Sequence, residues 1–193
     1  AARSLKGPLT LWGKTSAFSD SSDLYAIPVE AHVHSDFKNY CDTILIVDKG
    51  QKKVSSSKGH QLMLGHPYAD KRFEQANRHC VALKSVLENG DLEQFIEITE
   101  SEALSLHAMM MTSSPRYLLM QPNTLQIINK IWDYRVTTNI PLSFTLDAGA
   151  NVHLLYPAVE RDKVIEFIKS ELIGYCQSGQ FIEDQVGLGA KKM

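Results

Sequence analysis

The sequence predicts an α+β domain in which an antiparallel sheet of about four strands carries helices on one face. Segments with the period of strands and segments with the period of helices follow one another without a regular β-α-β alternation. In addition, residues 142–156 have the pattern of two strands joined by a glycine-bearing turn. With 193 residues, of which 44% are hydrophobic, the chain can bury one substantial core. We therefore expect one main domain.

Composition argues against several classes of function. The chain has 20 basic and 22 acidic residues, a formal net charge of -2, and no basic run of the kind that binds a phosphate backbone. It has no long apolar run and no charged-then-apolar leader, so we expect no membrane span, no signal peptide and a cytoplasmic location. Its cysteines are widely spaced, and its histidines show no metal-ligand spacing with them. We therefore expect no nucleic-acid partner, no disulfide framework and no metal site.

The first 23 residues are predicted to form a short helix and a polar loop. The sequence opens within this helix, whose beginning we expect to be missing, and the helix either ends near Gly7 or continues to about Trp12 before a serine-rich loop. The chain opens without an initiator methionine and in a helix-favouring stretch. We therefore expect it to be part of a longer protein, with 1–23 a remnant of an amino-terminal domain and 24–193 the main domain.

Three strands are predicted outside the 142–156 hairpin. Apolar residues alternate from 25 to 33, where Pro28 removes one backbone donor and so favours an edge position. Residues Thr43–Val47 are apolar on both faces, which is typical of a central strand. A final strand of poor propensity is predicted near 185–190, where two glycines interrupt the pattern.

Four helices are predicted from apolar residues at three-four spacing. Gly90 stops the first helix and Asp91 caps the second, so these two helices form a hairpin. The buried face of the first helix includes Phe73, and that of the third includes Trp132. His107 on the second helix is interpreted as a hydrogen-bonded core residue, because a lone histidine on a mixed face is more often structural than chemical. The four helices cover about 68–87, 91–112, 123–138 and 161–176.

A serine- and lysine-rich segment follows the predicted central strand. Ser55, Ser56 and Ser57 lie between Lys53 and Lys58, just ahead of a predicted helical stretch. Hydroxyls and free amide donors at the start of a helix converge on anions with help from the helix dipole, so a diphosphate would fit there. The alternative is that one serine caps the helix and the lysines are solvated.

The segment 142–156 places a carboxylate at a turn. Apolar and polar residues alternate along its first strand, so Asp147 leaves the apolar face where that strand ends. Gly149 and Asn151 then lead into the second strand. Because aspartate, glycine and asparagine all favour turns, an ordinary hairpin turn is the alternative interpretation.

Four segments resemble the diphosphomevalonate decarboxylases, which belong to the GHMP small-molecule kinase superfamily. Asp147-Ala-Gly-Ala-Asn is similar to the family's Asp-Ala-Gly-x-Asn turn, which carries the catalytic aspartate. Val54-Ser-Ser is similar to a Val-Ser-Ser segment that contacts the substrate. Arg3 lies in an Ala-Arg-Ser-Leu stretch that resembles the family helix whose arginine holds the substrate carboxylate. The run Leu106-His-Ala resembles the family's Phe-His-Ala.

This resemblance implies a GHMP carboxyl-terminal domain, which is a ferredoxin-like α+β layer. The implied reaction is ATP-dependent decarboxylation of mevalonate diphosphate to isopentenyl diphosphate, in isoprenoid and sterol biosynthesis, with ATP and Mg2+ bound mainly by an amino-terminal part. We therefore expect the 193 residues alone to fold but to be inactive, and the family is also compatible with a homodimer. The implied catalytic residues are Asp147 and Arg3, and the implied substrate-binding residues are Ser55, Ser56, Lys58, Ala148 and Gly149.

Two other functions stay open at this point. One is that of another GHMP small-molecule kinase, for mevalonate or phosphomevalonate. Such kinases usually have a glycine-rich turn where this chain has Asp147, which favours the decarboxylase. The other is a non-enzymatic α+β binding domain, in which the serine segment binds no anion.

Overall fold

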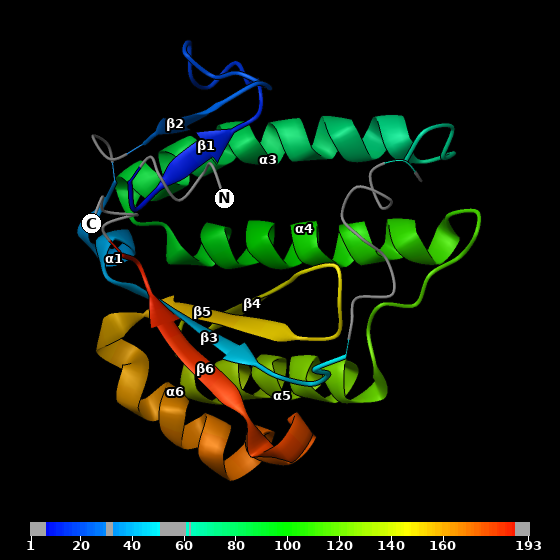
Figure 1. The fold of residues 1–193 in the computed structure, drawn as a ribbon. Coiled ribbons are helices and arrows are strands. Elements are labelled where there is room, and N and C mark those ends of the chain that lie inside the picture. The colour runs from blue at the N-terminus through cyan, green and yellow to red at the C-terminus, as the bar shows by residue number, and fades with distance from the viewer. Residues whose placement is uncertain (1–6, 30–32, 51–60, 62, 188–193) are drawn as a thin grey trace, which may run out of the picture.

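Figure 1 shows the computed structural model, which describes residues 7–29, 33–50, 61 and 63–187. Within these residues the main sheet has four antiparallel strands in the order β4-β5-β3-β6, and β1 and β2 form a separate two-stranded sheet. Helices cover one face of the main sheet and pack on its β4 edge. The predicted α+β class with a four-stranded antiparallel sheet is confirmed. The four strands are β3 (Tyr40–Leu45), β4 (Ser143–Leu146), β5 (Val152–Pro157) and β6 (Phe181–Gln185).

The central pair of the main sheet is β3 and β5. Leu45 lies opposite Val152 in their register, and both side chains are fully buried. Because side chains alternate along a strand, residues of the same parity share this buried face. The prediction that Thr43–Val47 contributes a central strand is confirmed, although the strand begins at Tyr40 and ends at Leu45.

The main hydrophobic core lies between this sheet face and two helices, α5 (Pro122–Thr138) and α6 (Arg161–Phe167). The sequence predicted a single helix over 161–176, whereas the chain continues from α6 as a π-helical turn, Ile168–Leu172, and a 3-10 turn, Ile173–Tyr175. The apolar face persists through this change, because side chains of both the regular and the irregular parts are buried together. Core side chains from these helices include Ile127, Ile128, Ile131, Val164, Ile168 and Leu172.

Helices α3 (Ala69–Asn89) and α4 (Leu92–Thr112) form the predicted hairpin. Gly90 ends α3 with a left-handed backbone at φ 75°, and the Asp91 side chain accepts a hydrogen bond from the amide of Gln94 at 3.0 Å. These caps satisfy backbone groups that helix ends leave without intrahelical partners. Helix α3 packs on α4, and α4 packs on the edge strand β4.

Two side chains that the sequence placed in the core are substantially exposed. Phe73 on α3 is 51% exposed, and Trp132 on α5 is 37% exposed. Helical periodicity predicts which side chains share a face, and it does not predict how far neighbouring elements extend over that face. Trp132 lies at the edge of the core instead, with its ring against Phe144.

Glu100 is a buried carboxylate that joins α4 to α5. It is 7% exposed, and its oxygens accept hydrogen bonds from Arg135 Nη1 at 2.6 Å and Nη2 at 3.1 Å, and from Trp132 Nε1 at 2.8 Å. Arg135 also donates to the carbonyl of Leu142, just before β4, at 2.7 Å. This bidentate pair compensates the cost of removing the carboxylate from water, which is why a charged residue is tolerated there.

The amino-terminal residues form a small two-stranded sheet. Strand β1 (Thr10–Trp12) pairs antiparallel with β2 (Ala26–Pro28). The expectation that a helix continues to Trp12 is therefore wrong, because threonine, leucine and tryptophan suit a strand and β2 supplies the hydrogen-bonding partner. Strand β2 is shorter than the predicted strand over 25–33, and Pro28 lies in an edge strand as predicted. The expected domain boundary after residue 23 falls between these two strands and stays a prediction.

Among the described residues, no helix is long and apolar enough to cross a membrane. The described cysteines are free thiols. Strand β6 ends at Gln185, where the last strand was expected to begin, and residues 188–193 lie outside the described part. Short helical elements are α1 (Ser35–Lys38) and two 3-10 turns, Ala158–Glu160 and Gln177–Gly179.

Replacing Glu100 by alanine leaves the partly buried guanidinium of Arg135 without its carboxylate. We expect Glu100→Ala to lower the free energy of unfolding by about 3–5 kcal/mol, the range for removing one partner of a buried ion pair. Urea unfolding followed by circular dichroism measures the change. Glu74→Ala is the matched control, because it removes the partner of Lys71 in an exposed pair on α3 and should change stability little. Equal effects of the two substitutions would contradict the role of Glu100.

Candidate active site

Asp147 is the first residue after β4 and opens the turn into β5. Its side chain is exposed, and its carbonyl accepts a hydrogen bond from the amide of Gly149 at 2.7 Å. Because Leu146 points into the core, the next side chain along the chain points to the opposite face of the sheet. Asp147 therefore lies at a tight turn with its side chain away from the core face, as the alternation along the strand predicted.

The main chain of Asp147 is also held from α4. His107 is 1% exposed, and its Nε2 lies 3.1 Å from the carbonyl oxygen of Asp147. Because a carbonyl oxygen only accepts, Nε2 carries the proton and donates. Burial lowers the pKa of His107 below its ordinary value of 6.5, and the hydrogen bond to Asp147 opposes this shift in part. His107 is therefore a neutral imidazole that holds the turn, in agreement with its interpretation as a hydrogen-bonded core residue.

Two further side chains hold the turn from other elements. Asn151 Oδ1 accepts hydrogen bonds from the amides of Val47 at 2.9 Å and Asp48 at 3.0 Å, which ties the turn to the end of β3. Thr124, in the first turn of α5, donates its hydroxyl to the carbonyl of Ala150 at 2.7 Å. Contacts from the β3 end, α4 and α5 thus hold the main chain of the turn.

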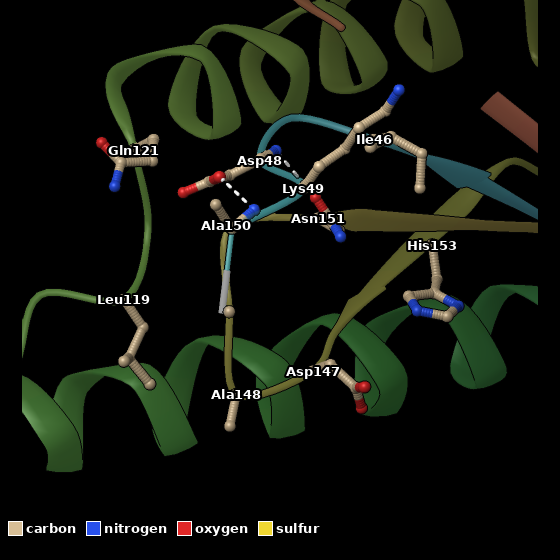
Figure 2. A pocket seen from close by; sticks show the side chains of 12 residues that line it. Ile46, Asp48, Lys49, Leu119, Gln121, Asp147, Ala148, Ala150, Asn151 and His153 are labelled. Carbon is tan, nitrogen blue, oxygen red and sulfur yellow. Dashed lines mark hydrogen bonds between the residues drawn. The ribbon is translucent and has the colours of Figure 1, made fainter. Parts of the chain in front are cut away.

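The turn borders a cavity of about 290 Å³ (Figure 2). Its other walls are His153 on β5, Leu119 and Gln121 ahead of α5, and four residues after β3, Ile46, Asp48, Lys49 and Gly50. The lining residues include the acidic Asp147 and Asp48, the basic Lys49 and the amide-bearing Gln121. The cavity therefore offers charges of both signs and hydrogen-bond donors to a small polar ligand.

Some predicted site residues meet at this cavity, and others lie outside the described part of the chain. Asp147, Ala148 and Gly149 are consecutive in the turn and all line the cavity. Gly50 also lines it, immediately before the undescribed residues 51–60. The predicted substrate contacts Arg3, Ser55, Ser56 and Lys58 lie in 1–6 and 51–60, outside the described residues.

Sequence reasoning missed Asp48, Lys49, Gln121 and His153 as cavity residues. The first three lie in connecting segments, and only the folded chain brings them beside the turn. His153 carried a usable signal, because it is a polar residue between the apolar neighbours Val152 and Leu154 in a predicted strand. It therefore had to point to the sheet face opposite the core, which is the face of Asp147.

Replacing Asn151 by leucine removes the acceptor of two backbone amides. We expect Asn151→Leu to lower the free energy of unfolding by about 1–3 kcal/mol, mainly the cost of leaving the partly buried amide of Val47 unsatisfied. Guanidinium unfolding followed by tryptophan fluorescence measures the loss. Asn123→Leu is the control, because it removes a single exposed hydrogen bond to the carbonyl of Tyr175. A loss as large in the control would mean that the Asn151 contacts add nothing specific.

The lowered pKa of His107 makes stability depend on pH. The folded state binds a proton at this site less readily than the unfolded state, whose pKa is near 6.5, so acidification below about pH 6.5 favours unfolding. In His107→Gln the side-chain amide still donates to Asp147 but does not titrate. We expect its free energy of unfolding to fall less between about pH 7 and about pH 5 than that of the unmodified chain. Urea titrations at both pH values test this, and an equal fall would exclude His107 as the titrating group.

The chain resembles known proteins along most of its length. The family described as mevalonate 5-diphosphate decarboxylase C-terminal domain matches residues 43–191. The diphosphomevalonate decarboxylase of Candida albicans is 24% identical over 170 residues, which cover 87% of this chain and 46% of that protein. The chain thus spans less than half the length of this relative.

Solved structures share the described fold. The mevalonate diphosphate decarboxylase of Staphylococcus aureus matches with a TM-score of 0.81 at 22% identity, over 98% of this chain and 55% of that chain. The structure of MDDEF in complex with MVAPP, AMPPCP and magnesium matches with a TM-score of 0.82 at 20% identity, over 98% of this chain and 55% of that chain. At these identities the structural likeness concerns the fold. Because the family match extends from residue 43 to residue 191, this chain belongs to the mevalonate 5-diphosphate decarboxylase C-terminal domain family.

Proposed function

We propose that this chain is the carboxyl-terminal part of an enzyme that converts mevalonate diphosphate to isopentenyl diphosphate by ATP-dependent decarboxylation. Membership of the decarboxylase family supports this reaction. The observation that carries the proposal is the placement of Asp147, which is exposed at a cavity while α4 holds its carbonyl. A carboxylate on a main chain held in this way is oriented before the substrate binds, which lowers the entropic cost of the reaction.

Asp147 acts on the tertiary 3-hydroxyl of the substrate. Its carboxylate orients this hydroxyl and accepts its proton while the oxygen attacks the γ-phosphorus of ATP, and ADP leaves. The new phosphate then departs from C3 with the electron pair of the C3–O bond. The electrons of the bond between C2 and the carboxylate carbon form the C2–C3 double bond. The products are isopentenyl diphosphate, phosphate, ADP and carbon dioxide.

The anionic ends of the substrate are assigned to residues outside the described part. Arg3 holds the carboxylate, because a guanidinium offers a permanent charge and two parallel donors. Ser55, Ser56 and Lys58 hold the diphosphate through hydroxyl and ammonium donors. The position of Gly50 on the cavity wall supports this assignment, because the serine segment follows directly in the chain.

ATP and Mg2+ bind mainly to another part of the parent protein. A complex with AMPPCP and magnesium in a structure of the same fold supports the use of both. Within the described ranges of this chain, no group of three histidine, cysteine, aspartate or glutamate side chains could hold a metal ion, so we assign no step to a metal. On this proposal residues 1–23 belong to the preceding domain and the 193 residues alone are inactive. The parent protein is then a cytoplasmic enzyme of isoprenoid and sterol biosynthesis, and the family is compatible with a homodimer.

Asp147→Asn in the full-length parent protein tests this proposal. The amide cannot accept the hydroxyl proton, so we expect the rate of ATP-dependent carbon dioxide release to fall at least about 100-fold, the lower range for loss of a general base. Coupled assays of ADP and carbon dioxide measure the rate. Asp162→Asn is the matched control, because this aspartate has a fully exposed side chain on α6 and should leave the rate unchanged.

The wild-type parent distinguishes the remaining functions in the same assay. Release of ADP without carbon dioxide would identify a kinase of the superfamily and overturn the proposed decarboxylation. Release of neither product would favour a non-enzymatic binding domain.

A further inference from the structure

One residue of the cavity wall belongs to an ionisable pair that the proposed reaction does not use. His153 on β5 lines the cavity, and its Nδ1 lies 3.0 Å from each carboxylate oxygen of Asp42 on β3. The side chain of His153 is 20% exposed and that of Asp42 is 36% exposed. Both side chains are therefore partly buried and keep some contact with solvent.

The ring of His153 contacts a diagonal neighbour on β3 and not the residue directly opposite in the register of the sheet. His153 lies opposite Ile44 on β3 and opposite Thr145 on β4. Asp42 instead lies opposite Leu155, two residues farther along β5. The ring thus turns away from its direct neighbours to meet Asp42. The two nitrogens of an imidazole flank one ring carbon and point in divergent directions, so Nε2 does not point at the carboxylate that Nδ1 contacts.

On the β4 side of His153, the diagonal neighbour in the opposite direction is Asp147. Asp147 lies two residues beyond Thr145, the cross-strand neighbour of His153. Such diagonal neighbours on one sheet face are about 7–8 Å apart, within reach of a long side chain or a shared ligand. Figure 2 shows the side chains of Asp147 and His153 pointing to the same side of the β4–β5 hairpin. A ligand bound against Asp147 therefore comes within reach of His153.

The charges around His153 favour a donor at this position. Asp48 and Asp147 line the same cavity, with Lys49 as a cationic neighbour. Asp184 on β6 lies opposite Asp42 in the register. An anionic ligand entering this acidic surrounding needs positive charge or N–H donors close by. Asp42 accepts from Nδ1, which orients the ring, and Nε2, on the edge toward the Asp147 end of the hairpin, donates when the ring is an imidazolium.

We propose that His153, oriented by Asp42 and in its imidazolium form, is a substrate-binding residue that donates from Nε2 to an oxyanion of the substrate held against Asp147. This inference rests on the proposed function, because it takes mevalonate diphosphate as the ligand. That molecule carries a carboxylate and a diphosphate on either side of the hydroxyl on which Asp147 acts, and both groups present the required oxyanion. Asp42 is a positioning residue, because it contacts the imidazole rather than the ligand.

Direct binding to the full-length parent protein tests the inference without turnover. Calorimetric titration with mevalonate diphosphate in the absence of ATP should show affinity weakened roughly tenfold or more in His153→Leu, the loss expected for a hydrogen bond to a charged group. His153→Lys should restore most of the affinity, because it supplies a cationic donor at the same place. His79→Leu is the matched control and should bind normally. His79 also pairs with a carboxylate, Glu102, at 2.7 Å and is 24% exposed, but it does not line the cavity.

Separate titrations with inorganic diphosphate and with mevalonate identify the anionic end that His153 contacts. A loss of affinity for diphosphate assigns His153 to that group, and a loss for mevalonate assigns it to the carboxylate. In steady-state assays His153→Leu should raise KM more than it lowers kcat, because the contact serves binding. Asp42→Asn should change KM in the same direction but less.

Unchanged affinity for all three ligands in a folded His153→Leu variant overturns the inference. This outcome can be distinguished experimentally from failure of the proposed decarboxylation. If the wild-type parent releases carbon dioxide and His153→Leu binds normally, only the role of His153 is wrong. If binding depends on His153 but the wild type releases no carbon dioxide, the binding role stands and the decarboxylation is wrong.

Discussion

The candidate site depends on one constraint, which is that the main chain of the turn after β4 is held from three sides. His107 contacts the Asp147 carbonyl, Thr124 the Ala150 carbonyl, and Asn151 the amides at the end of β3. Each contact satisfies a backbone polar group that would otherwise lose a partner on leaving water. The geometry around Asp147 therefore forms only when α4, α5 and the central sheet are all in place.

Buried polar groups are also paired where the sheet meets the helices. Arg135 bridges the carboxylate of Glu100 on α4 and the carbonyl of Leu142 just ahead of β4. The apolar core sets the distance between the sheet and α5, and this polar bridge sets how the chain enters β4. Because β4 leads directly to Asp147, the packing of the core and the placement of the candidate catalytic carboxylate are linked through one short strand.

Local patterns predicted much of the fold and a smaller part of the site. The α3–α4 hairpin was predictable because Gly90 and Asp91 are strong end signals, and the strand before Asp147 because its apolar and polar residues alternate. The amino-terminal strand was not predicted, since β1 is stabilised by pairing with β2, 14 to 18 residues away in their register. The burial of Glu100 was missed because a charged residue enters a core only with its partner, and Arg135 lies on another helix.

By itself, the sequence determined the class of the fold, the order of most of its elements and the residue that carries a carboxylate at the turn. These properties follow from periodicity and from the turn preferences of aspartate, glycine and asparagine, which act over a few residues. The tertiary structure alone decided that His107 and Thr124 hold that turn, that Gln121 lines the same cavity, and that Asp42 contacts the ring of His153. Asp42 and His153 are separated by 111 residues in the chain. Contacts at such separations arise from sheet register and helix packing, which no local pattern of side chains specifies.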